Sequence, residues 1–417
     1  MPNFIDLFAG AGGLSEGFIR SGFTPIAHVE KDISACFTLK TRIAYHYLKN
    51  ENKLGIYQKY QKGLINRKTL YSYIPKEKIE SVINLEISSQ NNLKIQGEID
   101  QKLKGRKVDL IIGGPPCQAY STAGRSRSIS KMKGDPRNYL FKEYAKYLNQ
   151  YKPKALVFEN VIGLKSAKGG EYLLHMKKLF EKNGYQIKLY TLHANDFGVL
   201  QNRKRIIIIG VKSDKKLELP SLEKVKINHE YLVNSIFDDL PYLQEGEGRN
   251  KFLEYREPPN DYLKKFSVRN DFEVLTQHVA RPQSENDKKI YKIVVKKWTK
   301  NGLRLDYNDL PENLKTHRNT SSFIDRYKVV ASNLPHCHTV VAHISKDGHY
   351  YIHPDLRQNR SISVRESARL QSFPDSYYFE GILENNNRTA AFRQIGNAVP
   401  PLMAEQIAKY LKPLIVK

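Results

Sequence analysis

One cysteine lies in a setting that favours chemistry over packing. Cys117 ends the run GGPPC at 113–117, which directly follows a predicted strand at 108–113. Two prolines stiffen the backbone before it, and the carboxyl edge of a parallel sheet is where ligands bind. A lone cysteine is usually a small buried hydrophobe, but this turn is a poor place for core filler. The pattern predicts a nucleophilic thiolate.

A carboxyl and two cations follow at the same predicted sheet edge. Glu159 ends a strand at 154–159, and Arg203 and Arg205 lie at the start of a strand at 205–211. Taken separately, Glu159 fits a helix-capping carboxylate and the arginines fit a solvated basic run. Together with the thiol they provide an acid donor and a cation for covalent attack on a base. We therefore expect Cys117, Glu159, Arg203 and Arg205 to be catalytic.

The N-terminus has the pattern of a nucleotide-binding element. A strand at 3–8 is followed by Gly10, Gly12 and Gly13 and then by a helical stretch. Glycines let a ligand approach the backbone, and a helix N-terminus favours negative charge. Glu30 ends the second strand, where a carboxylate can accept ribose hydroxyls. By itself this element is compatible with NAD, a flavin or S-adenosylmethionine, and the absence of the third glycine of the dinucleotide fingerprint disfavours a dehydrogenase.

Six segments, in order along almost the whole chain, resemble the motifs of the C5-cytosine DNA methyltransferases. They are FIDLFAGAGGLSEGF (4–18), GGPPCQAYS (113–121), ENV (159–161), QNRKRIIIIG (201–210), RESARLQSFPDSY (365–377) and QIGNAVPP (394–401). The resemblance implies methyl transfer from S-adenosylmethionine to C5 of cytosine in a specific double-stranded DNA sequence. It implies that Cys117 adds to C6 of a flipped-out base, while Glu159 acts at N3 and Arg205 at O2.

The resemblance also assigns binding residues by position. It implies cofactor contacts by Asp6, Phe8, Gly10, Gly12, Gly13, Leu14, Glu30, Lys31, Glu86, Ile87, Pro116, Asn397 and Val399. It implies DNA contacts by Gln118, Ser121, Arg125, Arg127 and Thr339. Three positions depart from the family pattern: Glu86 where Asp is more frequent, Lys31 in place of an aromatic, and Val340 in place of Leu.

The elements that must position these residues alternate between strand and helix. Strands at 3–8, 24–29, 81–87, 108–113, 154–159 and 205–211 are separated by helical patterns. This alternation predicts an α/β fold with a doubly wound, mostly parallel sheet, of the Rossmann-like methyltransferase kind. We expect a catalytic domain at 1–212 with an insertion at about 49–80, and a smaller, irregular, β-rich target-recognition domain at 213–385. A C-terminal segment at 386–417 returns to the catalytic domain.

Composition is compatible with these expectations. Lys and Arg number 68 against 43 Asp and Glu, and the formal charge of +25 favours a polyanionic partner. The basic stretch 118–137 suits a loop that holds phosphates and closes over a flipped base, although an exposed linker has the same composition. Polar side chains at 278–297 and 317–328 suit contacts with base edges.

Other features set limits on the site and the cellular setting. The three cysteines show no paired spacing, so we expect no disulfide framework. Five histidines at 336–353 suggest zinc, but alternating side chains on a strand point to opposite faces, and we expect no metal. Without a transmembrane-length run or a signal peptide, a cytoplasmic monomer is expected.

Three functions are weighed against one another. The first is a DNA cytosine-5 methyltransferase of a prokaryotic restriction–modification or related defence system, with a cognate endonuclease as a possible partner. The second is a tRNA cytosine-5 methyltransferase of the same fold, which the long variable region disfavours. The third is a DNA-binding relative without catalysis, which the presence of Cys117, Glu159 and Arg205 disfavours.

Overall fold

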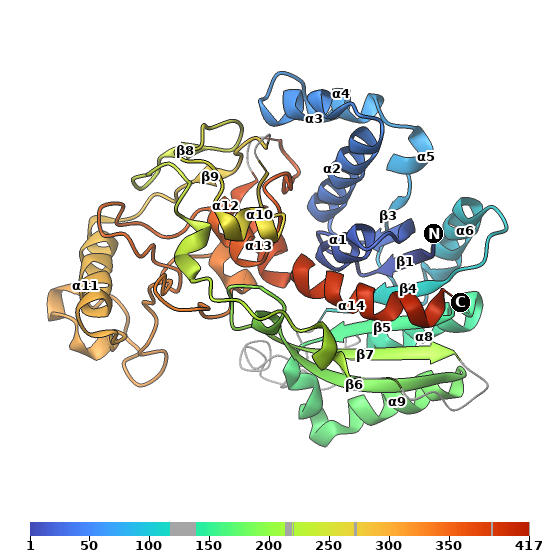
Figure 1. The fold of residues 1–417 in the computed structure, drawn as a ribbon. Helices are drawn as coiled ribbons and strands as arrows, with labels where there is room; N and C mark the ends of the chain where they lie inside the picture. Colours follow the sequence, from blue (N-terminus) through green and yellow to red (C-terminus); the bar gives the residue numbers. More distant parts are fainter. Residues whose placement is uncertain (117–138, 213–218, 220, 271–272, 385–386, 417) are drawn as a thin grey trace.

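A seven-stranded sheet forms the centre of the computed structural model, which describes residues 1–116, 139–212, 219, 221–270, 273–384 and 387–416 (Figure 1). The strands lie in the order β3-β2-β1-β4-β5-β7-β6. They are β1 Asn3–Leu7, β2 Thr24–Glu30, β3 Val82–Asn84, β4 Leu110–Gly113, β5 Ala155–Asn160, β6 Tyr185–His193 and β7 Lys204–Lys212. Strands β1 to β5 are parallel, and β7 is antiparallel to both β5 and β6. The doubly wound, mostly parallel fold predicted from the sequence is confirmed.

Alternate side chains of the strands enter two separate cores, one on each face of the sheet. On one face, Phe4, Leu110 and Val157 pack with α1 (Gly13–Arg20) and α14 (Pro401–Ile415). On the other face, Ile5, Ile111 and Leu156 pack with α6 (Asn92–Leu103), α8 (Leu140–Tyr151) and α9 (Glu171–Lys182). Both faces of the central strands are therefore covered, which is why these strands are continuous apolar runs.

The C-terminal helix α14 lies along α1 (Figure 1). The approach is so close that a Cβ atom on Gly17 would lie 2.3 Å from the backbone nitrogen of Glu405. Lys412 at the far end of α14 donates to the carbonyl oxygen of Ser21 at 2.8 Å. The last segment of the chain is thus an integral part of one layer of the sheet domain.

The residues between β2 and β3 form a helical extension on the sheet edge. Helix α2 (Ile33–Asn50) is followed by α3 (Leu54–Gln61), α4 (Arg67–Ser72) and α5 (Lys76–Ile79). Their apolar and tyrosine side chains share a small core with Tyr378. Arg67 donates to the carbonyl oxygens of Gly381 and Ile382, so this insertion braces the chain just before α13 (Arg388–Asn397).

The region after β7 is irregular, as expected, but its longest element is a helix. Helix α11 (Glu285–Asn301) begins with Ser284, whose hydroxyl accepts from the N–H of Asp287, and ends at Gly302. Among the described residues, the strands of this region are only β8 (Gly248–Arg249) and β9 (His278–Val279). The remaining elements are η5 Leu222–Val225, η6 Val233–Ile236, α10 Asp261–Lys265, η7 Tyr307–Asp309, η8 Glu312–Leu314, η9 Ala342–Ser345 and α12 Val364–Leu370. The β-rich character predicted for this region is therefore wrong for the part that the structure describes.

Figure 1 shows α11 at the side of the molecule away from the sheet. It packs on a core of its own with Tyr307, Tyr327 and Ile352. By contrast, α12 and the residues that follow it, such as Phe373 and Phe379, belong to the core beneath α1 and α14. No helix within the described ranges is long and apolar enough to cross a membrane.

Candidate active site

The turn after β1 leaves open space beside its backbone at Gly10. Phe8, Gly10 and Gly12 have φ values of 60°, 54° and 82°, and this left-handed region favours glycine. A Cβ atom on Gly10 would meet no atom within 4 Å, whereas one on Gly13 would lie 2.3 Å from the carbonyl oxygen of Val399. Gly10 therefore leaves room for a ligand, and Gly13 lets the C-terminal segment approach.

The carboxylate of Glu30 ties this turn to the end of β2. Its Oε2 accepts from the N–H of Gly10 at 2.8 Å, and its Oε1 accepts from the N–H groups of Lys31 and Asp32 at 2.9 and 2.8 Å. Burial raises the pKa of Glu30, while the backbone donors oppose that rise. The side chain is only partly buried. It is therefore fixed by the backbone at the mouth of the glycine turn.

The predicted adenine side of this space lies across β2 and β3. Ile87 is buried, whereas Glu86 is exposed and pairs with Lys31 at 2.8 Å. Both partners are more than half exposed, so this pair adds little to stability. Phe8 is half-buried and packs against the core of that face of the sheet. These predicted cofactor residues come together at the carboxyl ends of neighbouring strands.

Asp6 and Leu14 lie beneath the turn rather than in it. Both side chains are buried. The Asp6 carboxyl accepts a hydrogen bond from the Ser15 hydroxyl in the first turn of α1. Burial raises the pKa of Asp6 to about 8, and the charge of Glu30 adds to the rise. These two residues support the turn from within the core.

A second cluster lies at the ends of β4 and β5. Glu159 pairs with Arg205, whose Nε lies 2.7 Å from Oε1, and each side chain is 12% exposed. A Cβ atom on Gly114 would lie 2.6 Å from Oε2 of Glu159. The backbone that leads to Pro116 therefore runs against this carboxylate, and only glycine permits the approach. Burial raises the pKa of Glu159, although Arg205 and then Arg203 act to lower it.

Asn160 connects the same two segments. Its side chain donates to the carbonyl oxygen of Pro115 at 3.4 Å and accepts from the N–H of Val161 at 2.9 Å. The side chain that follows Glu159 thus helps to hold the backbone of the Pro-Pro turn. This holding role was not predicted, although the residue lies within one of the six sequence segments.

Arg203 occupies a different environment from Arg205. Its side chain is fully buried, with a relative exposure of 0%. Its guanidinium donates to the carbonyl oxygens of Val340 at 2.8 Å, Gly396 at 3.1 Å and Ala398 at 2.8 Å. It therefore joins the start of β7 to two segments that are distant in sequence, and these bonds are those of a bridging residue.

Two predicted cofactor residues of the C-terminal segment, Asn397 and Val399, follow α13. Val399 is buried against the glycine turn, as the distance to Gly13 requires, and Asn397 is exposed. Gln201 joins two other segments, because its amide donates to Leu370 O at 3.0 Å and accepts from the Val340 N–H at 2.8 Å. Its long-range partners explain why the sequence alone gave it no role.

Several predicted residues lie outside the described residues. They are Cys117, Gln118, Ser121, Arg125 and Arg127. The predicted DNA contact Thr339 is described and half-buried, and its hydroxyl donates to the carbonyl oxygen of Asn202.

Buried arginines of the fifth motif were also missed by sequence reasoning. Arg365 and Arg369 are fully buried, and Arg369 pairs with Asp239 and Asp375 at 2.5 Å each. The tyrosine of the same motif, Tyr377, donates to the carbonyl oxygen of Ala11 in the glycine turn. This motif therefore supports the turn and contributes no group to the candidate chemistry.

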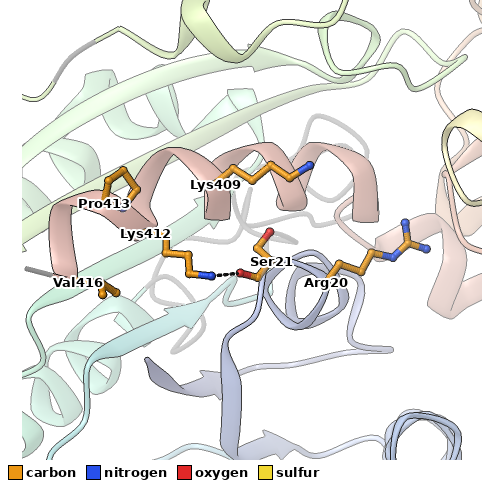
Figure 2. A pocket seen from close by; sticks show the side chains of 6 residues that line it. All are labelled: Arg20, Ser21, Lys409, Lys412, Pro413 and Val416. Atoms are coloured by element: carbon orange, nitrogen blue, oxygen red, sulfur yellow. Dashed lines mark hydrogen bonds between the residues drawn. The ribbon is translucent and has the colours of Figure 1, made fainter. Parts of the chain in front are cut away.

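An open cavity lies away from this candidate site. It has a volume of about 550 Å³ and is lined by Arg20, Ser21, Lys409, Lys412, Pro413 and Val416 (Figure 2). Lys412 already donates to Ser21 O, and Lys409 pairs with Glu405 at 2.6 Å. This open space lies at the end of α1 opposite to the glycine turn, and we assign it no role in the site. Across the described ranges, no three side chains of His, Cys, Asp or Glu gather as metal ligands.

Comparisons with known proteins agree with this geometry. The family model of C-5 cytosine-specific DNA methylases matches residues 2–62 and 65–413. The chain is 43% identical to the type II methyltransferase M.Bpa9945I of Bacillus paralicheniformis, over 99% of this chain and 98% of the relative. It is 31% identical to the type II methyltransferase M1.HphI of Haemophilus parahaemolyticus, over 97% of this chain and 85% of the relative.

Two solved structures share the fold. One is a prophage-encoded protein of E. coli assigned as a DNA modification methyltransferase, with a TM-score of 0.66 and 23% identity over the full length of both chains. The other is the Entamoeba histolytica methyltransferase EhMeth, with a TM-score of 0.57 and 16% identity over 100% of this chain and 99% of the other. The resemblance that six segments indicated is thus confirmed along nearly the whole chain.

Proposed function

The chain belongs to the family of C-5 cytosine-specific DNA methylases, and we propose that it transfers a methyl group from S-adenosylmethionine to C5 of cytosine by covalent catalysis through Cys117. It is a DNA (cytosine-5) methyltransferase of the type II restriction–modification kind. The covalent proposal rests chiefly on the close approach of Gly114 to Glu159, whose carboxylate is paired with Arg205. This contact brings the backbone three residues before the thiol against an acid and a cation.

The residues around the glycine turn fit S-adenosylmethionine. Gly10 faces open space, and the Glu30 carboxylate is held at the mouth of that space by three backbone donors. Glu30 would accept from the ribose hydroxyls, Phe8 and Ile87 would contact the adenine, and Val399 would close the other side. When bound, S-adenosylmethionine supplies an electrophilic methyl group for C5.

Cys117 and its neighbours would activate the base. Cytosine C5 is a poor nucleophile, so a thiolate must first add to C6 and turn the ring into an enamine. Electron density then moves toward N3 and O2. Glu159 would donate a proton at N3, because burial raises its pKa and increases the protonated fraction. Arg205 would stabilise the charge at O2.

The remaining steps restore the aromatic ring. After C5 is methylated, an ordered water would take the C5 proton. The bond between the Cys117 sulfur and C6 would then break, and its electrons would leave with the thiolate. Glu159 would take back the proton that it gave to N3, so that the methylated base leaves neutral. We assign Arg203 to positioning and not to these steps, since its donors are engaged by three backbone carbonyls.

The target base must leave the duplex to reach this pocket, at a cost of a few kcal/mol. We propose that residues 118–137, with Gln118, Ser121, Arg125 and Arg127, contact the DNA beside that base. The catalytic part would comprise 1–212 and 386–417, and the target-recognition part 213–385. We further propose that the protein acts as a monomer and shares its site with a cognate endonuclease.

The test is expression in a host without cytosine methylation, followed by bisulfite sequencing of its DNA. We expect methylated cytosines in one short sequence context. Methylation confined to tRNA would instead support the tRNA alternative, and no methylation would support a relative without catalysis. The variants Cys117→Ser and Cys117→Ala should lose methyl transfer and still bind the same duplex.

A duplex carrying 5-fluorocytosine at the mapped position tests the covalent step. Fluorine at C5 cannot leave as a proton, so wild-type protein and S-adenosylmethionine should yield a species that survives denaturing electrophoresis. Active enzyme that gives no such species would contradict the addition of Cys117 to C6.

A further inference from the structure

A loop of the region after α11 presents a phenylalanine to solvent. Residues 316–324 are nine consecutive exposed residues. Within them, Phe323 is 66% exposed and has a φ of 56°. A bulky side chain in the left-handed region is an outlier that costs folding energy. Exposure of an aromatic ring also contributes nothing to folding, so neither property is explained by the stability of the isolated chain.

The loop is nevertheless firmly built. Arg326 is buried, and its guanidinium lies 4.0 Å from the ring centroid of Tyr307. Its Nε donates to Phe323 O at 3.0 Å and its Nη2 donates to Asn319 O at 2.7 Å. The Asn319 side chain accepts from the N–H of Ser322 at 3.0 Å. These bonds hold the turn from inside, so the ring of Phe323 is presented by a pre-organised backbone.

The same bonds occupy two polar side chains of the loop that were expected to contact DNA. Asn319 and Arg326 are side chains that the sequence suggests as readers of base edges. In the structure, both are engaged in bonds within the loop. The apolar ring of Phe323 projects where a polar reader was expected.

The loop is connected to the candidate active site through described contacts. Lys328 lies 4.6 Å from the ring centroid of Tyr350, whose carbonyl oxygen bonds to the ring of His338. The next residue, Thr339, donates to Asn202 O at the beginning of the segment that carries the candidate catalytic arginine. The region that carries the loop is therefore joined by side-chain contacts to the segment that leads into β7.

We propose that Phe323 is a DNA-contacting residue whose ring stacks on an exposed base face of the bound duplex. The inference rests on the proposed function and names a residue that contributes to binding of the duplex. Every base offers a π face to an aromatic ring, and apolar side chains are known to enter opened base steps. A rigid backbone that already presents the ring avoids the cost of ordering it on binding.

The experiment uses the full chain and a duplex that carries the methylation site mapped by bisulfite sequencing. Phe323→Ala and Phe323→Asn should lower kcat/KM for that duplex about tenfold to hundredfold, as expected for the loss of one stacked base. Phe323→Trp should stay within about threefold of wild type, because it keeps a π face. Leu93→Ala is the matched control, since Leu93 is 82% exposed on α6, and its activity should be unchanged.

Two further readouts separate a DNA contact from a structural role. Asn tolerates a positive φ better than Phe, so Phe323→Asn should melt at the same temperature as wild type or higher. The salt dependence of duplex affinity should keep its slope in Phe323→Ala, because no phosphate contact is removed. Wild-type kcat/KM in Phe323→Ala, or a fall in melting temperature together with activity, would overturn the proposal. An inactive wild type would instead contradict the proposed function.

Discussion

The buried carboxyl of Asp6 should make the stability of this protein depend on pH in a predictable way. Asp6 is 1% exposed beneath the glycine turn. Burial raises its pKa from 3.8 to about 8, opposed by the Ser15 hydroxyl and reinforced by the charge of Glu30. In the folded chain the carboxyl is therefore mostly protonated at pH 7, whereas in the unfolded chain it loses its proton near pH 4.

The sign and the magnitude follow from this difference. Between pH 4 and pH 8 the folded state binds more protons than the unfolded state, so the free energy of unfolding falls as pH rises. The slope is about 1.4 kcal/mol per pH unit for one group. The advantage of the protonated folded state is complete below pH 4 and is lost as pH rises to about 8. Across pH 5 to 8 the loss is about 4 kcal/mol.

Asp6→Asn removes the titration and leaves an amide oxygen that can still accept from Ser15. The variant should therefore gain about 4 kcal/mol relative to wild type between pH 5 and pH 8. For 417 residues, the unfolding entropy is about 0.9 kcal/mol/K, so this gain corresponds to about 4 °C in Tm. Differential scanning fluorimetry at four pH values measures it. Glu77→Gln, which changes an exposed carboxyl in the same way, is the control for the effect of net charge.

A Tm difference between Asp6→Asn and wild type that stays constant from pH 5 to pH 8 would refute this reasoning. It would mean that the carboxyl is equally protonated in the folded and unfolded chains. A second check uses Glu30→Gln. Removing that charge should lower the pKa of Asp6, so the loss of stability with rising pH should be complete at a lower pH. The stability of the glycine turn would then depend less on pH near neutrality.

Three other substitutions test packing and catalysis. Arg203→Ala should lower the free energy of unfolding by about 3 to 5 kcal/mol in urea titrations, since three buried carbonyl oxygens lose their donor. Gly17→Ala should lower Tm clearly, because the new Cβ would lie 2.3 Å from the backbone nitrogen of Glu405. Arg205→Lys should reduce kcat about a hundredfold in a tritiated methyl-transfer assay, with S-adenosylmethionine affinity unchanged, because the cation paired with Glu159 is displaced.

The sequence predicts most of the sheet because its central strands are buried on both faces. The apolar run at 206–209 gives β7, and the strands at 3–8 and 24–29 give β1 and β2 to within a residue. The strand expected at 81–87 is shorter, because the Asn84 side chain binds the carbonyl oxygens of Glu30 and Lys31 and the chain then leaves the sheet. Such a partner, more than fifty residues away, has no local signal.

Strand β6 was missed for a different reason. Its sequence, YQIKLYTLH, alternates polar and apolar side chains at the sheet edge, and it pairs along its full length with β7. A period-two pattern was therefore available in the sequence. Because helices were expected between all strands, β6 was not predicted, and neither was the antiparallel pairing at this end of the sheet.

Some residues of the candidate site can be predicted from the local sequence, and others depend on partners that are distant in the sequence. Glu30, Glu159 and Arg205 end or flank strands, so strand prediction suffices to bring them to one edge. Arg369 could not be assigned, because its partners Asp239 and Asp375 form a buried network that only the folded chain defines.

Arg203 and Arg205 show that a sequence motif can identify the residues near a site without defining the role of each one. They are two residues apart in one basic run, and both would be exposed if that run were a solvated surface. The fold instead buries Arg203 completely and leaves Arg205 at 12% exposure beside Glu159. Because the donors of Arg203 hold the chain at 340 and at 396–398, any displacement of either segment must break one of these bonds or move the start of β7. We therefore expect substitutions at Arg203 to disturb the start of β7 and both of these segments together.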